Sequence, residues 1–154
     1  MVQVDVTSLA LDTQVNAPVV FLKERDGTKI LPIWIGFAEA ASIARALEHI
    51  KPERPLTHDL MAALLNGMDA KLLRIVINKV ENDTYYARIY LQKDSHIIEI
   101  DARPSDSIAL ALRMGAPIYI ENEVMEKAID LAHYGGLKEN LMNVEPEKFG
   151  ELDL

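Results

Sequence analysis

The sequence predicts an α+β fold, with an antiparallel or mixed β-sheet and four helices packed against it. The predicted strands come in consecutive runs, whereas a parallel βαβ protein would alternate strand and helix strictly. Residues 71–101 hold three alternating apolar segments separated by short polar turns, which indicates a three-strand antiparallel meander. Four further segments combine helical spacing of apolar residues with glycine or proline at their ends.

The first part of the chain predicts three strands. The N-terminal alternation changes phase at Thr7-Ser8, which indicates a strand with a β-bulge. Two apolar runs follow at 18–23 and 31–35, and Asp26-Gly27 between them favours a type I′ hairpin turn with positive φ. Because Pro32 lacks an amide proton for a sheet ladder, the third strand is expected at an edge or to be irregular there.

Two helices are expected between this hairpin and the meander. The first spans about 37–50, where alanine, isoleucine and leucine form one apolar face. Residues 51–56 contain two prolines and cannot be helix interior. Thr57 is the predicted N-cap of the second helix, which Gly67 ends.

After the meander, a third helix is predicted from Pro104, then a short strand at 118–120 and a fourth helix at about 123–132. The core is expected within about 4–132. Four acids and one lysine from residue 145 on predict a solvated acidic tail at about 137–154. No linker or low-complexity segment divides the chain, so the 154 residues are expected to form one domain.

Composition excludes several classes of protein. With 49% hydrophobic and 26% charged residues, the chain is typical of a globular protein. The absence of cysteine excludes disulfides, thiolate zinc sites and a cysteine nucleophile. No apolar run approaches the roughly 18 to 20 residues of a membrane span, and the N-terminus resembles no signal peptide. A cytoplasmic protein without membrane association is therefore expected.

The net charge of −8 bears on partners. Nucleic-acid binders generally present a basic field, because contacts with phosphates supply most of their non-specific affinity. An RNA or DNA substrate would therefore need a local basic patch, or a metal ion that inverts the charge at the site.

The polar residues most suggestive of a site surround the start of the third helix. Asp101, Arg103, Ser105, Asp106 and Arg113 fall within thirteen residues, next to a strand-to-helix turn. Proline suits the first helical position, and an acid in the first turn meets free amide groups and the positive end of the helix dipole.

At these residues the sequence resembles the bifunctional nuclease family, a bacterial and plant domain first catalogued as a domain of unknown function. The similarity lies in Leu31–Gly36 with Glu39-Ala40, in Arg54–Leu60, and in Asp101–Arg113. The resemblance implies an α+β domain that hydrolyses phosphodiester bonds of RNA and DNA. It brings no settled list of catalytic residues.

One hypothesis is a metal-assisted nuclease. Asp101, Asp106 and Glu39 would hold Mg²⁺ or Mn²⁺, because a divalent cation of this kind takes one or two carboxylates together with water and substrate phosphate. Asp101, Asp106, His58 and Asp59 are the candidate catalytic residues, the imidazole serving as general base or metal ligand. The candidates for contact with substrate phosphate are Arg54, Arg103, Ser105 and Arg113.

The alternative hypothesis is a non-catalytic interaction or anion-binding module that works as a homo-oligomer. In it each acid caps or balances its own helix, and Arg103 pairs with Asp101 to fasten the turn. A homodimer is expected in either case, through the proline-containing edge strand and exposed tyrosines. No G-x-G-x-x-G or Walker motif occurs, so no nucleotide cofactor is expected. Ser105 also lacks the G-x-S-x-G context of a serine hydrolase.

Overall fold

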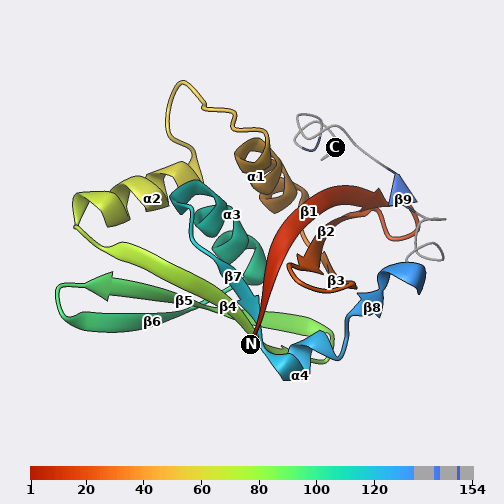
Figure 1. The fold of residues 1–154 in the computed structure, drawn as a ribbon. Helices are drawn as coiled ribbons and strands as arrows, with labels where there is room; N and C mark the ends of the chain where they lie inside the picture. The colour runs from red at the N-terminus through yellow and green to blue at the C-terminus, as the bar shows by residue number, and fades with distance from the viewer. Residues whose placement is uncertain (134–140, 143–148, 150–154) are drawn as a thin grey trace.

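A nine-stranded mixed sheet is the framework of the molecule, shown in Figure 1 as a computed structural model that describes residues 1–133, 141–142 and 149. The strands are β1 (Val2–Asp12), β2 (Ala17–Glu24), β3 (Lys29–Trp34), β4 (Lys71–Glu81), β5 (Thr84–Lys93), β6 (His96–Ala102), β7 (Ile118–Ile120), β8 (Ile129–Asp130) and β9 (Leu141–Met142). Their order is β6-β5-β4-β7-β1-β2-β3-β8, and β9 pairs with β1. The pairing of β4 with β7 is parallel and the others are antiparallel, so the mixed sheet and the predicted meander are confirmed.

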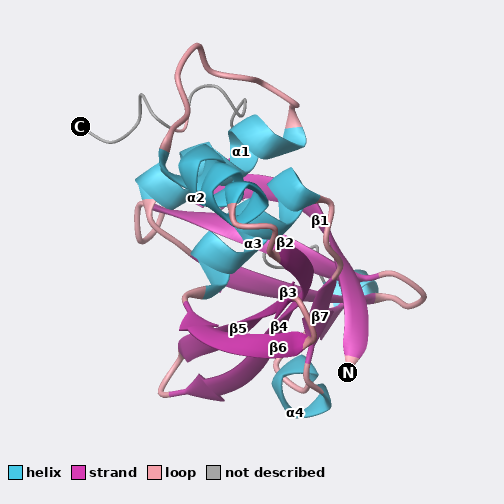
Figure 2. Cartoon of the chain, turned by 90° about the vertical axis from the view of Figure 1, so that its left-hand side faces the viewer, coloured by secondary structure: helices cyan, strands magenta, loops and turns pink. Residues whose placement is uncertain are grey.

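Three longer helices gather on one side of the strands, as Figure 2 shows. The helices of the described residues are α1 (Phe37–Leu47), α2 (Thr57–Gly67), α3 (Pro104–Met114) and the short α4 (Asn122–Met125). α3 is the central one, since it contacts α1, α2, β4 and β5. Both its ends follow the prediction, with Pro104 at the first position and Gly115 in the left-handed region at φ 66°.

Apolar side chains fill both faces of β2, which explains why this strand reads as a continuous apolar run. Val20 and Leu22 belong to the main core beneath α1 and α3. Val19 and Phe21 belong to a smaller cluster on the opposite face, with Ala10 and Ile30. Because side chains alternate along a strand, β2 is covered on each side by a different layer.

The first hairpins follow the prediction with one correction. The bulge in β1 lies between Val6 and Ser8, as expected. Pro32 pairs with β2, while β8 reaches only the first residues of β3, so this proline faces an open edge as predicted. The β2–β3 turn is not type I′, because neither Asp26 nor Gly27 has positive φ. A four-residue loop replaces it, and the Lys23 ammonium donates to the Gly27 carbonyl at 2.9 Å.

Two helix boundaries differ from the prediction. α1 ends at Leu47, before residue 50, because His49 takes a left-handed conformation at φ 55° and the Ile50 amide donates back to the Arg45 carbonyl. Leu56 is the N-cap of α2, and Thr57 is its first helical residue. The cap hydrogen bond comes from the Leu56 amide to the Asp59 carboxylate, at 3.0 Å.

The C-terminal region departs furthest from the prediction. The helix expected at about 123–132 stops at Met125, because the chain extends to place β8 beside Lys29 and Ile30 and cover the edge of β3. Of the predicted acidic tail, β9 pairs with β1 and the Phe149 side chain is fully buried in the main core. The acids of that tail lie outside the described residues.

Candidate functional site

His58 lies at the meeting point of the three longer helices. It is the second residue of α2 and only 7% exposed. Its Nδ1 atom lies 2.6 Å from the Ser42 hydroxyl on α1, and its Nε2 atom lies 2.8 Å from the Asp106 carboxylate on α3. A hydroxyl, an imidazole and a carboxylate from separate helices therefore form one hydrogen-bonded chain.

The charge on Asp106 fixes the direction of this chain. Burial alone would raise the pKa of Asp106, but hydrogen bonds from Arg103 and His58 outweigh it and lower that pKa below its usual value. An ionised carboxylate only accepts hydrogen bonds, so Nε2 of His58 carries a proton and donates a hydrogen bond to Asp106. In the neutral imidazole Nδ1 is then free to accept the Ser42 hydroxyl proton. This is the arrangement of a hydroxyl activated by a base.

Arg103 joins Asp106 to Glu39. Its Nε atom donates to Asp106 at 2.8 Å, and a terminal nitrogen donates to Glu39 at 3.0 Å. The Arg103 side chain is 63% exposed, so this pair of contacts faces solvent. The structural alternative had paired Arg103 with Asp101; the structure pairs it with Asp106 and Glu39.

These side chains line an open cavity of about 320 Å³, here called the His58 cavity. That volume lies within the range of small-ligand pockets, about 300–1,000 Å³. Its lining residues are Ala38, Glu39, Ser42, Arg45, Leu56, Thr57, His58, Arg103 and Asp106.

Arg45 lines this cavity without an ion pair to any acid in the described part of the chain. Its Nε atom is buried and has no hydrogen-bond partner in the described part of the chain, and no ion pair of Arg45 is found there. Burial and the positive charge of Arg113 lower the pKa of Arg45, and the negative charge of Asp59 offsets this only in part. A half-buried guanidinium without a hydrogen-bonded counter-ion among the described residues favours an anionic ligand, because the ligand would complete its charge balance.

Asp59 and Arg113 form a second cluster that braces the helices. Arg113 Nε donates to Asp59 at 2.8 Å, and its terminal nitrogens donate to the carbonyls of Ala109 and Ser42. Burial opposes ionisation of Asp59, but the hydrogen bonds from Arg113 and the Leu56 amide lower its pKa. Asp59 therefore lies apart from the His58 cavity, in contact with Arg113.

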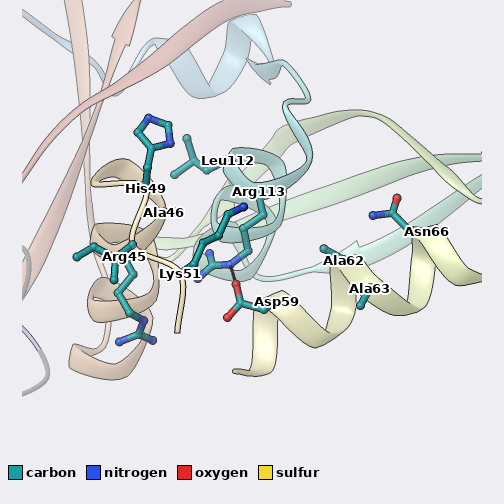
Figure 3. Close-up of a pocket in the computed structure, with 11 residues that line it drawn as sticks. Arg45, Ala46, His49, Lys51, Asp59, Ala62, Ala63, Asn66, Leu112 and Arg113 are labelled. Atoms are coloured by element: carbon teal, nitrogen blue, oxygen red, sulfur yellow. Dashed lines mark hydrogen bonds and ion pairs between the residues drawn. The ribbon is translucent and has the colours of Figure 1, made fainter. Parts of the chain in front are cut away.

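This cluster lines a neighbouring cavity of about 530 Å³, shown in Figure 3. Asp59 and Arg113 point toward one another across it, from α2 and α3, while the side chain of Arg45 is directed away from them. Arg45 contributes to the lining of both cavities, so the two hollows adjoin at this residue.

Three other predicted residues lie away from the His58 cavity. Asp101 is exposed on β6, opposite Arg88, and its side chain makes no hydrogen bond or ion pair within the described ranges. Arg54 is exposed in the loop between α1 and α2 and is absent from the cavity lining. Ser105 is buried and lines a different cavity, together with Trp34.

The predicted metal-ligand set is not assembled. Within residues 1–133, 141–142 and 149, no group of three or more histidine, aspartate or glutamate side chains is arranged to hold a metal ion. Asp106 and Glu39 share Arg103 between them, and Asp101 contacts neither. As these side chains lie, they do not fit the proposed cation.

Sequence reasoning missed Ser42 and Arg45. The one signal available for Ser42 is a hydroxyl within the otherwise apolar stretch 40–44, and Arg45 lies three residues later on the same side of the helix. Neither residue belongs to a motif, because the groups they join come from other helices.

The described helices include none that is long and apolar enough to cross a membrane.

Comparison with known proteins identifies the family of this chain. A family model described as the bifunctional nuclease domain matches residues 20–131. An uncharacterized protein of Mycobacterium tuberculosis (strain ATCC 25618 / H37Rv) is 41% identical over 128 residues, which cover 83% of this chain and 76% of that protein.

More distant similarity is found to plant proteins. Bifunctional nuclease 1 of Oryza sativa subsp. japonica is 28% identical over 77% of this chain, and bifunctional nuclease 1 of Arabidopsis thaliana is 27% identical over 67%. The matched regions span 35% and 33% of those two plant proteins. The match to the family model extends from β2 to the end of β8 and includes every residue of the His58 cavity. The chain belongs to the bifunctional nuclease domain family.

Proposed function

We propose that this chain is a nuclease that hydrolyses phosphodiester bonds of RNA and DNA, with the His58 cavity as its active site. One observation carries the proposal: an imidazole held between a hydroxyl and an ionised carboxylate lies in a cavity that also presents two guanidiniums. The family and the names of the plant relatives support the reaction class.

His58 is the general base of this reaction. DNA has no 2′-hydroxyl, so an enzyme that cleaves both nucleic acids needs a nucleophile from outside the sugar. The unprotonated Nδ1 atom takes the proton of that nucleophile, and Asp106 stabilises the imidazolium that forms. Asp106 therefore acts as a positioning residue that holds one tautomer of His58.

Arg45 and Arg103 bind the phosphate. Glu39 and Asp106 already balance much of the charge of Arg103, whereas Arg45 has no such partner among the described residues. Arg45 is therefore the principal anion-binding group, and it supplies the local positive charge that a chain of net charge −8 needs. Arg113 was also predicted to contact substrate phosphate, but its guanidinium already donates to Asp59 and to two backbone carbonyls.

Dependence on Mg²⁺ or Mn²⁺ stays a prediction, and the roles proposed here for His58 and the arginines do not need a cation. Cleavage is measured with and without EDTA, and with either metal added back. Loss of cleavage in EDTA and its recovery with one metal would support the cation.

Replacing Arg45 with glutamine is expected to lower kcat/KM for a single-stranded oligonucleotide about 10- to 100-fold. A hydrogen bond to a charged group contributes about 1.5–3 kcal/mol, and each 1.4 kcal/mol corresponds to about a factor of ten. The Arg54→Gln protein is the matched control, because it loses the same charge from an exposed loop outside the cavity. Equal rates for wild type and Arg45→Gln would point to a contaminating nuclease or a misplaced site.

An anion-binding module without catalysis is the second candidate function. The guanidinium of Arg45, which forms no ion pair among the described residues, favours it as much as it favours a nuclease, since binding needs only the cation. Fluorescence anisotropy with the same oligonucleotide separates the two, because a module binds through Arg45 and leaves the strand intact.

The homodimer expected from the sequence also stays a proposal, and other surfaces support it better than the tyrosines do. Leu60 and Leu64 are half exposed on α2, and Ile97 and Ile100 are exposed on β6, an edge strand of the sheet. Exposed apolar side chains on a helix and on an edge strand are typical of surfaces that bind a second copy.

A further inference from the structure

We propose that Ser42 is the nucleophile of this nuclease and that cleavage passes through a phosphoserine ester at Ser42. This inference rests on the proposed function and adds to it the atom that attacks phosphorus. It also revises what the sequence implied, since the lack of a G-x-S-x-G motif had argued against a serine nucleophile.

Geometry is the first support. The Ser42 hydroxyl oxygen lies 2.6 Å from Nδ1 of His58, within the distance at which a base can take its proton. His58 is in turn oriented by a third group, Asp106, at 2.8 Å. A nucleophile, a base and an orienting carboxylate in series are the signature of an activated hydroxyl, whatever the fold or the order in the chain.

The second support is that Ser42 forgoes the ordinary partner of a helical serine. A serine inside a helix usually donates to the carbonyl four residues earlier, as Ser107 does to Arg103 at 2.9 Å. Ser42 instead directs its hydroxyl out of α1 toward the imidazole. Although the residue is only 4% exposed, it lines the His58 cavity, where Arg45 and Arg103 would hold the phosphate beside it.

The first half of the reaction transfers the phosphoryl group to the protein. The Ser42 oxygen attacks phosphorus while its proton passes to Nδ1 of His58. The bond between phosphorus and the leaving sugar oxygen breaks, and that oxygen, which in-line attack places opposite Ser42, takes a proton from a water molecule while His58 keeps the proton of Ser42. One strand end leaves with a free hydroxyl, and the other stays esterified to Ser42.

Water completes the cycle. The hydroxide formed from that water attacks the same phosphorus from the side that the sugar oxygen left, the bond from phosphorus to the Ser42 oxygen breaks, and that oxygen takes its proton back from Nδ1. The net change is one phosphodiester bond and one water converted into a hydroxyl end and a phosphate-monoester end. Asp106 accepts the hydrogen bond from Nε2 throughout and balances the charge of the imidazolium.

The stereochemical course at phosphorus tests this directly. A phosphorothioate diester of one configuration is cleaved by the full chain in ¹⁸O-labelled water, and the configuration of the chiral product is determined. Two successive displacements predict retention. Inversion would mean direct attack by water and would overturn the inference while leaving the nuclease function intact.

Variants give an independent measurement. The Ser42→Ala protein is expected to cleave about 10³-fold or more slowly than wild type. The matched control, Ser107→Ala, removes a buried hydroxyl bonded to its own helix and should cleave within about twofold of wild type. Acid-quenched wild type should carry the nucleotide on the Ser42 peptide in mass spectrometry.

Different results would contradict the Ser42 nucleophile and the nuclease function itself. If Ser42→Ala keeps at least a tenth of the wild-type rate, Ser42 is not the nucleophile, even where the His58 variant is inactive. If highly purified wild type cleaves neither RNA nor DNA, the proposed function falls and the nucleophile with it. Circular dichroism spectra of the Ser42 and His58 variants establish that a lower cleavage rate is not caused by loss of the fold.

Discussion

The His58→Gln protein is expected to cleave RNA and DNA about 10²- to 10⁴-fold more slowly than wild type, the usual contribution of a positioned general base. Glutamine keeps a polar side chain that can hydrogen-bond toward Ser42 and Asp106, but at neutral pH it takes up no proton. The loss should therefore appear in kcat for both substrates. Steady-state cleavage of a matched RNA and DNA oligonucleotide measures it.

His96 provides the control for this substitution. It is an exposed residue at the start of β6, on the meander, and is not among the residues that line the His58 cavity. The His96→Gln protein should keep the wild-type rate. If both histidine variants cleave alike, the imidazole at 58 is not the base and the active site lies elsewhere.

The Arg113→Met protein is expected to lose about 3 kcal/mol of unfolding free energy, because the partly buried carboxylate of Asp59 then loses its ion-pair partner. The Arg113 side chain is 10% exposed and that of Asp59 is 25% exposed, so solvent screens their contact only in part. The same guanidinium also donates to carbonyls of α1 and α3. Urea denaturation at neutral pH measures the difference.

An exposed ion pair is the comparison for this prediction. Arg88 and Glu99 lie 3.6 Å apart on β5 and β6, with side chains 43% and 54% exposed. Since surface pairs contribute about 0–1 kcal/mol, Arg88→Met should change the unfolding free energy by less than 1 kcal/mol. Equal effects of the two substitutions would contradict the bracing role given to Arg113.

Local signals predicted the parts of the fold that are built locally. The ends of α3 follow from Pro104 and Gly115, whose backbone preferences act at those positions alone. The meander follows from alternation and from turn residues, and Asn82 and Asp83 take positive φ in its first turn.

Long-range pairing explains what was missed. Residues 129–130 form β8 beside β3, about a hundred residues earlier in the chain, and this contact overrides the helical pattern of 123–132. The parallel register of β7 on β4 has the same origin. Nothing within either segment specifies such a distant neighbour.

The site shows the same limit. Asp59 and Asp106 look alike in sequence, as acids in the first turn of a helix. The fold gives Asp59 to Arg113, 54 residues away, and Asp106 to His58, 48 residues away. Their different roles follow from partners on other helices, and the choice of partner could not be derived from either helix alone.

The central claim is that catalysis depends on the hydrogen-bonded chain through Asp106, and the Asp106→Asn protein tests it most directly. Wild type and variant are purified in parallel, and kcat and KM are measured on one single-stranded DNA. We predict a folded protein whose kcat falls at least about 100-fold with a smaller change in KM, because the amide no longer holds His58 as a base. An unchanged kcat in a folded Asp106→Asn protein would contradict the account.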